Sequence, residues 1–227
     1  MVRVAVVDDE ELVRSALRLV LASADGIEVV ADCGGADAVG TVVAHRPDVV
    51  LLDVRMPDQD GLTVLRSLRE ALAGRLPAVA MLTTFDTDEY IGAALRLGAA
   101  GFLLKDTDPE QLVHSVRVLA AGGFALAPGV ARTVIGHYLE PATAPDHRAL
   151  LAVESLTARE RDVLALLGEG LSNLETAARL GLASSTVKDH VSVVLAKLGG
   201  LNRVQAAVVA DRAGLVRGPR PHRGAGG

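Results

Sequence analysis

Short apolar runs alternate with segments of helical periodicity through the first half of the chain. Val2–Val7 is apolar and ends in an acidic group, after which apolar residues recur at helical spacing from Leu12 to Leu21. Further apolar runs lie at 27–31, 49–52, 78–83 and 101–104, and further helical patterns at 36–44, 61–72, 86–97 and after Pro109. Five strand and helix units with short connections predict a doubly wound α/β domain with a five-stranded parallel sheet.

The run at 49–57 leads apolar residues directly into Asp53 and stops at Pro57. Such a run is typical of a strand buried on both faces, as in a parallel sheet covered by helices. In open α/β sheets, ligands bind outside the carboxyl ends of the strands, where Asp53 is expected. A lone Asp after a strand can also simply cap a turn, so the other strand ends decide between the two interpretations.

Polar residues follow the ends of four predicted strands: Asp8 and Asp9 the first, Asp53 the third, Thr83 the fourth and Lys105 the fifth. Two carboxylates about 4 Å apart repel each other by roughly 4 kcal/mol at an effective dielectric constant near 20, so this edge requires protonation or a bound cation. The oxygen ligands favour Mg²⁺. An Asp beside Mg²⁺ suits a phosphoryl acceptor, with Lys105 offsetting charge and the Thr83 hydroxyl donating to the phosphate.

The second half shows the pattern of a small helical domain. Thr157 and Glu160 have capping-box spacing, and Ser172 and Glu175 repeat it before a second short helix. Gly181 ends that helix, and Ser184 or Ser185 is expected to cap a longer third helix to about residue 198. A short helix, a turn with Gly and a longer helix outline a helix-turn-helix, and a further pattern at 203–213 makes a four-helix all-α domain.

Between these patterns, Gly122-Gly123 breaks the periodicity, a short helix is expected at about 128–139, and a Pro-containing linker at 140–147. The predicted organisation is 1–121 for the α/β domain, 122–152 for the linker with its short helix, 153–216 for the helical domain and 217–227 for a disordered tail.

Charge divides the chain into an acidic and a basic part. Residues 1–121 carry 11 Lys and Arg against 19 Asp and Glu, for −8, and residues 155–227 carry 10 against 6, for +4. A basic part suggests a polyanionic partner. No apolar run is long enough to span a bilayer and no basic leader precedes the first strand, so we expect a cytoplasmic protein without a membrane partner. The single Cys33 leaves no thiolate cluster for zinc.

The strand-end residues, together with Met56-Pro57 and Gly61 in this order, resemble a response-regulator receiver domain over residues 1–121. The resemblance implies a flavodoxin-like strand order 2-1-3-4-5 and phosphorylation of Asp53 by a partner sensor histidine kinase. It implies Mg²⁺ ligation by Asp8, Asp9, Asp53 and the Arg55 backbone carbonyl, phosphate contact by Lys105, and a switch pair formed by Thr83 and Phe102. Asp106 stands where a Pro often follows the Lys.

In the second half, Leu156-Thr157, Arg159-Glu160-Arg161, Gly170-Leu171-Ser172-Asn173 and Thr186-Val187-Lys188 resemble a LuxR-type DNA-binding domain. With the receiver, the chain resembles the NarL/FixJ group of response regulators. The resemblance implies that the 184–198 helix enters the major groove and that the 203–213 helix forms a dimer contact, so that two promoter half-sites are bound together. Lys188, Asp189 and Ser192 then face bases, while Thr186, Lys197 and Arg203 contact phosphates.

This helix departs from the family pattern in its charge. Val193 replaces a frequent basic or polar residue, and Asp189 is repelled by DNA phosphates although its carboxylate can accept a hydrogen bond from cytosine. A solvated surface role for Asp189 is the alternative.

The sequence also bears on three other functions. A haloacid dehalogenase requires a second Asp two residues after the nucleophile, where this chain has Arg55. A nucleotide-binding redox protein requires a Gly-rich turn after the first strand, where Asp8 and Asp9 would repel a pyrophosphate. We therefore expect a transcription regulator and no enzyme; a regulator whose receiver only dimerises or senses a ligand, without phosphorylation, stays open.

Overall fold

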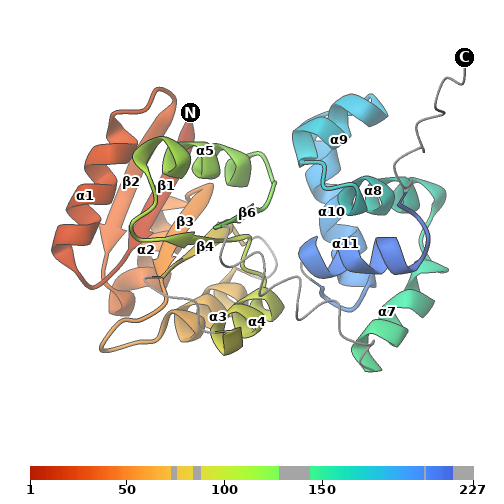
Figure 1. Cartoon of the computed structure of the whole chain (residues 1–227), viewed down its shortest axis with the longest axis horizontal. Helices are drawn as coiled ribbons and strands as arrows, with labels where there is room; N and C mark the ends of the chain where they lie inside the picture. Colours follow the sequence, from red (N-terminus) through yellow and green to blue (C-terminus); the bar gives the residue numbers. More distant parts are fainter. Residues whose placement is uncertain (73–75, 84–87, 128–143, 202, 217–227) are drawn as a thin grey trace, which may run out of the picture. The chain divides into compact units, whose positions relative to one another are not determined.

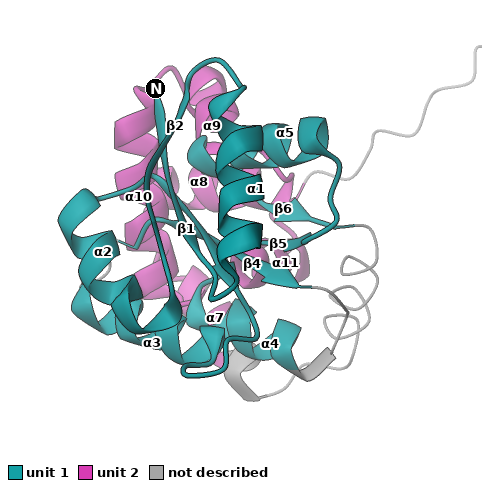
Figure 2. Ribbon diagram, turned by 90° about the vertical axis from the view of Figure 1, so that its left-hand side faces the viewer, with its two compact units in different colours: residues 1–141 teal, residues 142–227 magenta. Residues whose placement is uncertain are grey.

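Two compact units make up the chain, residues 1–141 and 142–227 (Figure 2). The computed structural model describes residues 1–72, 76–83, 88–127, 144–201 and 203–216. Each unit has its own apolar core and is described separately below.

A parallel sheet in the order β2-β1-β3-β4-β5-β6 forms the centre of the first unit (Figure 1). Its first five strands confirm the order predicted from the resemblance, and β3 is buried along its whole length. The strands are β1 (Val2–Val7), β2 (Ile27–Cys33), β3 (Val49–Asp53), β4 (Ala78–Thr83), β5 (Gly101–Leu104) and β6 (Ala125–Leu126).

Helices cover both faces of this sheet, with α5 on one side and α3 and α4 on the other (Figure 1). Alternate strand residues such as Val6, Leu51 and Leu82 pack with α1 and α5 residues such as Leu21 and Val116. The helical elements are α1 (Glu11–Ala22), η1 (Gly35–Asp37), α2 (Ala38–His45), α3 (Gly61–Ala71), α4 (Asp88–Leu97) and α5 (Pro109–Ala120). Burial of both strand faces explains why these strands have continuous apolar sequences.

The sixth strand was not expected from the sequence. β6 extends the sheet by pairing Gly101 with Ala125 and Phe102 with Leu126 in parallel register. This segment lies after Gly122-Gly123, where the sequence predicts the start of the linker. A two-residue strand shows no alternation that a sequence pattern can reveal.

Five helices form the described part of the second unit: α7 (Ala144–Val153), α8 (Ala158–Gly168), α9 (Asn173–Leu180), α10 (Ser184–Lys197) and α11 (Arg203–Arg212). The helix α7 corrects the expected linker, because residues 144–147 begin a helix whose Ala149 and Val153 join the core with α11. The linker was predicted partly because of Pro145, but Pro is tolerated in the first turn of a helix. The short helix expected at 128–139 lies outside the described residues.

Capping boxes begin two of these helices, as predicted. The Thr157 side chain accepts from the Glu160 backbone while Glu160 accepts from the Thr157 backbone, and Ser172 and Glu175 do the same at α9. Gly181 ends α9 in the left-handed conformation at φ 65°. The expected serine cap of α10 is wrong, because the N-cap is Ala183 and no side chain caps that end. Within the described residues, no helix combines the length and apolarity that crossing a membrane requires.

Candidate functional site

The carboxyl edge of the parallel sheet gathers the predicted polar residues. Asp8 follows β1, Asp53 and Thr83 are the last residues of β3 and β4, and Lys105 follows β5. Neighbouring registers bring these ends together, since Asp53 pairs with Leu82 and Thr83 with Leu104. We call Asp8, Asp53, Thr83 and Lys105 the rim.

Lys105 is the centre of charge at the rim. Its Nζ lies 2.8 Å from Asp8 Oδ2 and 3.0 Å from Asp53 Oδ2. The Lys105 side chain is 12% exposed and the Asp53 side chain 5% exposed, and Asp8 is fully buried. One ammonium therefore holds two buried carboxylates that would otherwise repel each other.

Burial and these contacts shift two pKa values in the rim. Burial raises the pKa of Asp53, the Lys105 hydrogen bond opposes that shift, and the negative charge of Asp8 adds to it. Burial alone would lower the pKa of Lys105, but hydrogen bonds to Asp8 and Asp53 outweigh it, so the pKa is raised. Lys105 therefore stays a cation beside a carboxylate that benefits from further positive charge.

A third carboxylate reaches the same ammonium and was missed from the sequence. Glu10 Oε1 lies 3.3 Å from Lys105 Nζ, although the Glu10 side chain is 69% exposed. The Glu10 backbone N–H also donates to Asp8 Oδ1 at 2.9 Å. Its position directly after the acidic pair was the only available signal.

Asp9, by contrast, faces the chain after β2. Its Oδ1 accepts from the Gly35 backbone N–H at 2.8 Å, and a Cβ placed on Gly34 would lie 2.7 Å from the same oxygen. The structure therefore brings Asp8, Asp53 and Lys105 together and holds Asp9 beside them through η1.

A small cavity opens at the rim. It has a volume of about 90 Å³ and is lined by Glu10, Asp53, Val54, Arg55, Thr83 and Lys105. Liquid water takes about 30 Å³ per molecule, so this space suits a group of a few heavy atoms. Its lining includes two cationic residues, Arg55 and Lys105, two carboxylates and one hydroxyl.

The donor set of the rim fits Mg²⁺. Asp8 and Asp53 each direct an oxygen to one point, now held by Lys105 Nζ, and Arg55 lies against the same cavity. In the part of the chain that the structure describes, no three His, Cys, Asp or Glu side chains form a ready metal-binding group. Mg²⁺ usually takes only one or two carboxylates and keeps several waters, so two converging carboxylates suffice.

The predicted switch pair lies on adjacent strands. Thr83 is half-buried at the cavity, and Phe102 of β5, which pairs with Met81, is 1% exposed. Phe102 is thus part of the core beside β4. Its role as a switch stays a prediction.

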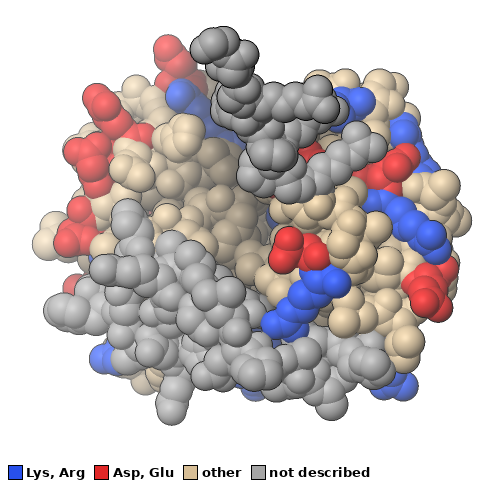
Figure 3. Space-filling model, turned by 45° about the vertical axis from the view of Figure 1, so that its right-hand side comes forward, with Lys and Arg blue, Asp and Glu red and all other residues tan. Residues whose placement is uncertain are grey.

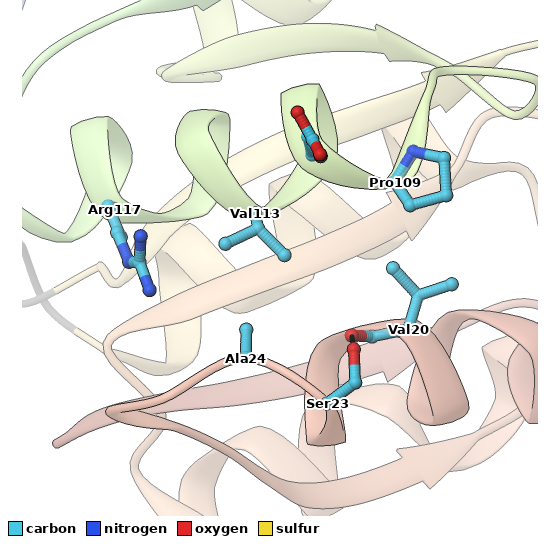
Figure 4. A pocket seen from close by; sticks show the side chains of 7 residues that line it. Val20, Ser23, Ala24, Pro109, Val113 and Arg117 are labelled. Carbon is cyan, nitrogen blue, oxygen red and sulfur yellow. Dashed lines mark hydrogen bonds between the residues drawn. The ribbon is translucent and has the colours of Figure 1, made fainter.

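A larger, shallower cavity lies between α1 and α5 (Figure 4). Its volume is about 290 Å³, and the side chains of Val20, Ala24 and Val113 give it an apolar floor. Arg117 on its border donates to the Asp25 carbonyl at 3.1 Å. This cavity shares no lining residue with the rim cavity.

One side of α10 is exposed along its length and contains the base-facing residues predicted from the resemblance. Its exposed residues recur at spacings of three and four, whereas Val187, Val191 and Val194 are buried. The exposed face, which we call the reading face, consists of Ser185, Lys188, Asp189, Ser192, Val193 and Ala196. Thr186, also exposed, lies near the start of the helix.

The other two predicted phosphate contacts are engaged inside the second unit. Lys197 Nζ lies 2.8 Å from both carboxylate oxygens of Glu160. Arg203 Nη1 donates to Asn173 Oδ1 at 2.9 Å, and its Nη2 donates to the Leu171 carbonyl. A phosphate contact by either residue would therefore require the exchange of these contacts.

These contacts also shift pKa values. The Lys197 hydrogen bond, and then that of the Thr157 backbone, lower the pKa of Glu160 below 4.5. Burial lowers the pKa of Arg203 to about 10, against the opposing effect of Glu175. Arg203 remains a cation at neutral pH and joins the start of α11 to the start of α9.

Acidic side chains accompany basic ones on the surface that Figure 3 presents. The second unit contains such pairs, including Arg179 and Glu169 at 3.8 Å. Among the described residues of this unit, some of the cations are therefore paired with carboxylates.

Comparison with known proteins identifies both units. Residues 4–117 match the family described as response regulator receiver domain, and residues 154–210 match the luxR family of bacterial regulatory proteins. The chain is 38% identical to the DNA-binding transcriptional activator DevR/DosR of Mycobacterium tuberculosis, over 96% of this chain and 98% of that protein. The chain belongs to the NarL-type response regulators. This response regulator is also 35% identical to the nitrate/nitrite response regulator NarL of Escherichia coli K12, over 90% of this chain and 93% of that protein.

Solved structures give the same result. The match to a LuxR-family two-component response regulator from Aurantimonas spans 62% of this chain and 99% of that chain, with 26% identity and a TM-score of 0.57. The receiver domain of a response regulator named NarL from M. tuberculosis covers 53% of this chain and is covered to 97%, with 39% identity and a TM-score of 0.50. The response regulator is thus a DNA-binding protein of a two-component system, and the hydrolase and redox alternatives are wrong.

Proposed function

We propose that Asp53 of this response regulator accepts a phosphoryl group from a partner sensor histidine kinase, and that this modification controls transcription. In this account phosphorylation favours a homodimer that binds two promoter half-sites together. The observation that carries the proposal is the convergence of Asp8 and Asp53 on Lys105 Nζ, at 2.8 and 3.0 Å, beside a cavity of about 90 Å³.

The rim residues divide the chemistry of transfer among them. An Asp53 carboxylate oxygen attacks the phosphorus of the donor, and the bond from phosphorus to the donor's histidine nitrogen breaks. The Lys105 ammonium, already 3.0 Å from Asp53, moves its hydrogen bonds onto the transferred oxygens. Asp8, the Asp53 carboxylate, the Arg55 carbonyl and Asp9 would hold Mg²⁺, which when bound supplies positive charge against those oxygens.

Transmission from the rim to the rest of the receiver is assigned to Thr83 and Phe102. Thr83 borders the cavity, and its hydroxyl is within the reach of a phosphoryl group placed there. Shifting a two-state element from 1:99 to 99:1 requires roughly 5.5 kcal/mol, which charge-assisted hydrogen bonds to a phosphoryl group can supply only if they differ between the two states. A rearrangement of buried Phe102 that is coupled to Thr83 provides such a second state.

DNA contact is assigned to α10. Its reading face presents Lys188, Asp189 and Ser192 to the base edges, and Thr186 near its start contacts a phosphate. Lys197 and Arg203 contact phosphates only after leaving Glu160 and Asn173. The free residues of the reading face are therefore assigned the larger share of binding.

Phosphoryl incorporation tests this proposal. Purified chain is incubated with Mg²⁺ and a small phosphoryl donor, and the mass and position of the added group are measured. We expect one phosphoryl group on Asp53 and none in Asp53→Asn, whereas the matched control Asp58→Asn, which removes an exposed carboxylate nearby, keeps full incorporation. Equal labelling of Asp53→Asn would reject Asp53 as the acceptor and favour a receiver that acts without phosphorylation.

A further inference from the structure

The reading face of α10 contains one cation and one anion at consecutive positions. Lys188 and Asp189 are both exposed, and neither takes part in an ion pair with any residue that the structure describes. The remaining residues of this face are small or apolar: Ser185, Ser192, Val193 and Ala196. The reading face therefore has no net charge. Its preference for a DNA sequence must come from where the Lys188 ammonium and the Asp189 carboxylate lie.

In the major groove, a carboxylate and an amide side chain bind different base edges best. Cytosine presents a single exocyclic amine, N4, which donates to a carboxylate. Adenine presents its N6 amine beside the N7 acceptor, a pair that matches the donor and acceptor of Asn. A carboxylate of Asp gains from the amine of adenine but is repelled by N7, so cytosine is the better partner for Asp189.

Resting on the DNA-binding role proposed above, we propose that Asp189 selects cytosine at one position of each half-site and that Lys188 selects guanine at an adjacent base pair. Lys188 donates to guanine O6 and N7, which are both acceptors. Consecutive helix residues point about 100° apart, so the two side chains reach neighbouring base pairs and not one base.

Supporting contacts hold α10 in place within the domain. Val187 and Val194, on the opposite side of α10, are completely buried. The end of the helix is tied to α8 by Lys197 and Glu160. Ser192 donates its hydroxyl to the Lys188 carbonyl at 3.0 Å, so its side chain presents lone pairs to a partner. A firmly seated helix can distinguish bases by hydrogen bonds of fixed direction.

Repulsion between Asp189 and the DNA phosphates increases the preference for one base. Every DNA sequence brings phosphates near Asp189, whereas only a base with a suitably placed amine offsets that repulsion. The reading face therefore binds unrelated DNA weakly, and removal of the carboxylate strengthens that binding while weakening the preference. This pair of opposite effects separates a base-reading carboxylate from a solvated surface residue.

Selection of binding sites from random DNA by the phosphorylated full-length chain tests this inference. Wild type is expected to enrich half-sites with cytosine at one position, and single-base changes there are expected to lower affinity about tenfold. Asp189→Asn is expected to change that position to adenine. Asp189→Ala is expected to lose the preference and to bind unrelated DNA more tightly. The matched control Asp162→Asn removes one exposed carboxylate from α8 and is expected to keep the wild-type sequence.

The outcomes distinguish this inference from the proposed function. If wild type enriches no sequence, the DNA-binding role fails and the inference fails with it. If wild type and both Asp189 variants enrich the same half-site, the protein reads DNA but Asp189 does not select a base. If the wild-type position is adenine, the assignment to cytosine is wrong.

Discussion

At the carboxyl edge of the sheet, Lys105 is 12% exposed and its Nζ lies within 3.3 Å of three carboxylates. On α10, Lys188 is exposed and forms no ion pair with the described residues, and the same holds for Asp189. The first site holds its charged groups against one another around a small cavity. The second leaves them for a partner.

This difference indicates which properties of the protein a substitution at each site would change. The rim is built into the core of the first unit, so a change in its packing is expected to affect folding and phosphoryl transfer together. The reading face lies on the surface of a unit whose helices are joined by polar contacts, Lys197 of α10 with Glu160 of α8 and Arg203 of α11 with Asn173 of α9. A change in these contacts is therefore expected to affect folding, whereas a change on the reading face is expected to affect only binding.

The largest effect is expected from Gly61→Ala, at the start of α3 beside the Asp53 backbone. A Cβ on Gly61 would overlap the Asp53 carbonyl oxygen and lie 3.1 Å from the Val54 Cα. Because both obstacles are backbone atoms of the segment that carries Asp53, we expect a loss of about 3 kcal/mol or more in the stability of the first unit. Amide hydrogen exchange of β1 and β3 measures this loss separately from the second unit.

Gly40→Ala is the matched control. Apart from its chain neighbours and the backbone of its own helix α2, no heavy atom of the described residues lies within 4 Å of a Cβ placed on Gly40. The added methyl group is expected to stabilise the helix by about 0.5 to 1 kcal/mol, because alanine has the higher helix propensity. Equal effects of the two substitutions would show that the close approach of Gly61 to the Asp53 backbone is not limiting.

A smaller but still large effect is expected from Arg203→Leu. The substitution leaves Asn173 Oδ1 and the Leu171 carbonyl without their donors, and Asn173 is only 7% exposed. We expect the second unit to lose roughly 2 to 4 kcal/mol, measured by amide hydrogen exchange of α9 and α10. The control is Arg179→Leu. Arg179 lies 3.8 Å from Glu169 and its side chain is 65% exposed, so we expect this substitution to cost less than about 0.5 kcal/mol. A similar loss in both variants would contradict a supporting role of Arg203.

The smallest effect is expected from Glu160→Gln and depends on pH. Because the Lys197 hydrogen bond lowers the pKa of Glu160 below 4.5, the ionised carboxylate stabilises the folded second unit above pH 4.5. That contribution is lost as the pH falls through the lower pKa of the folded state. Wild type is thus expected to be more stable than the variant at neutral pH and to lose this advantage in acid.

The control Glu154→Gln removes an exposed carboxylate of the same unit and is expected to leave the pH dependence of wild type unchanged. The measurement is the unfolding midpoint of the second unit across the acid range. An advantage of wild type over Glu160→Gln that persists in strong acid would mean that packing, and not the Lys197 ion pair, explains it.

Local patterns in the sequence predicted most of the fold. The five main strands and both capping boxes depend on residues within one element, so periodicity and cap spacing were sufficient. The strand ends also predicted the rim, because parallel strands share one edge. β6 and α7 were missed because a two-residue strand has no period and Pro145 resembled a linker signal.

Contacts between distant residues account for what the sequence could not show. Glu10 and Lys105 are 95 positions apart, and Arg203 and Asn173 are 30 apart. No local pattern distinguishes an arginine that binds a phosphate from one that donates to a buried asparagine. For the same reason, the sequence did not predict the contact between Lys197 and Glu160.

The most direct test of the account measures DNA affinity of wild type and Asp53→Asn, each with and without a small phosphoryl donor and Mg²⁺, on DNA selected by the phosphorylated wild type. We expect the donor to raise the affinity of wild type at least about tenfold, as for a coupling free energy of 1.4 kcal/mol or more, and to leave that of Asp53→Asn unchanged. An equal rise in both proteins, or no rise in wild type, would contradict control of the reading face by phosphorylation of Asp53.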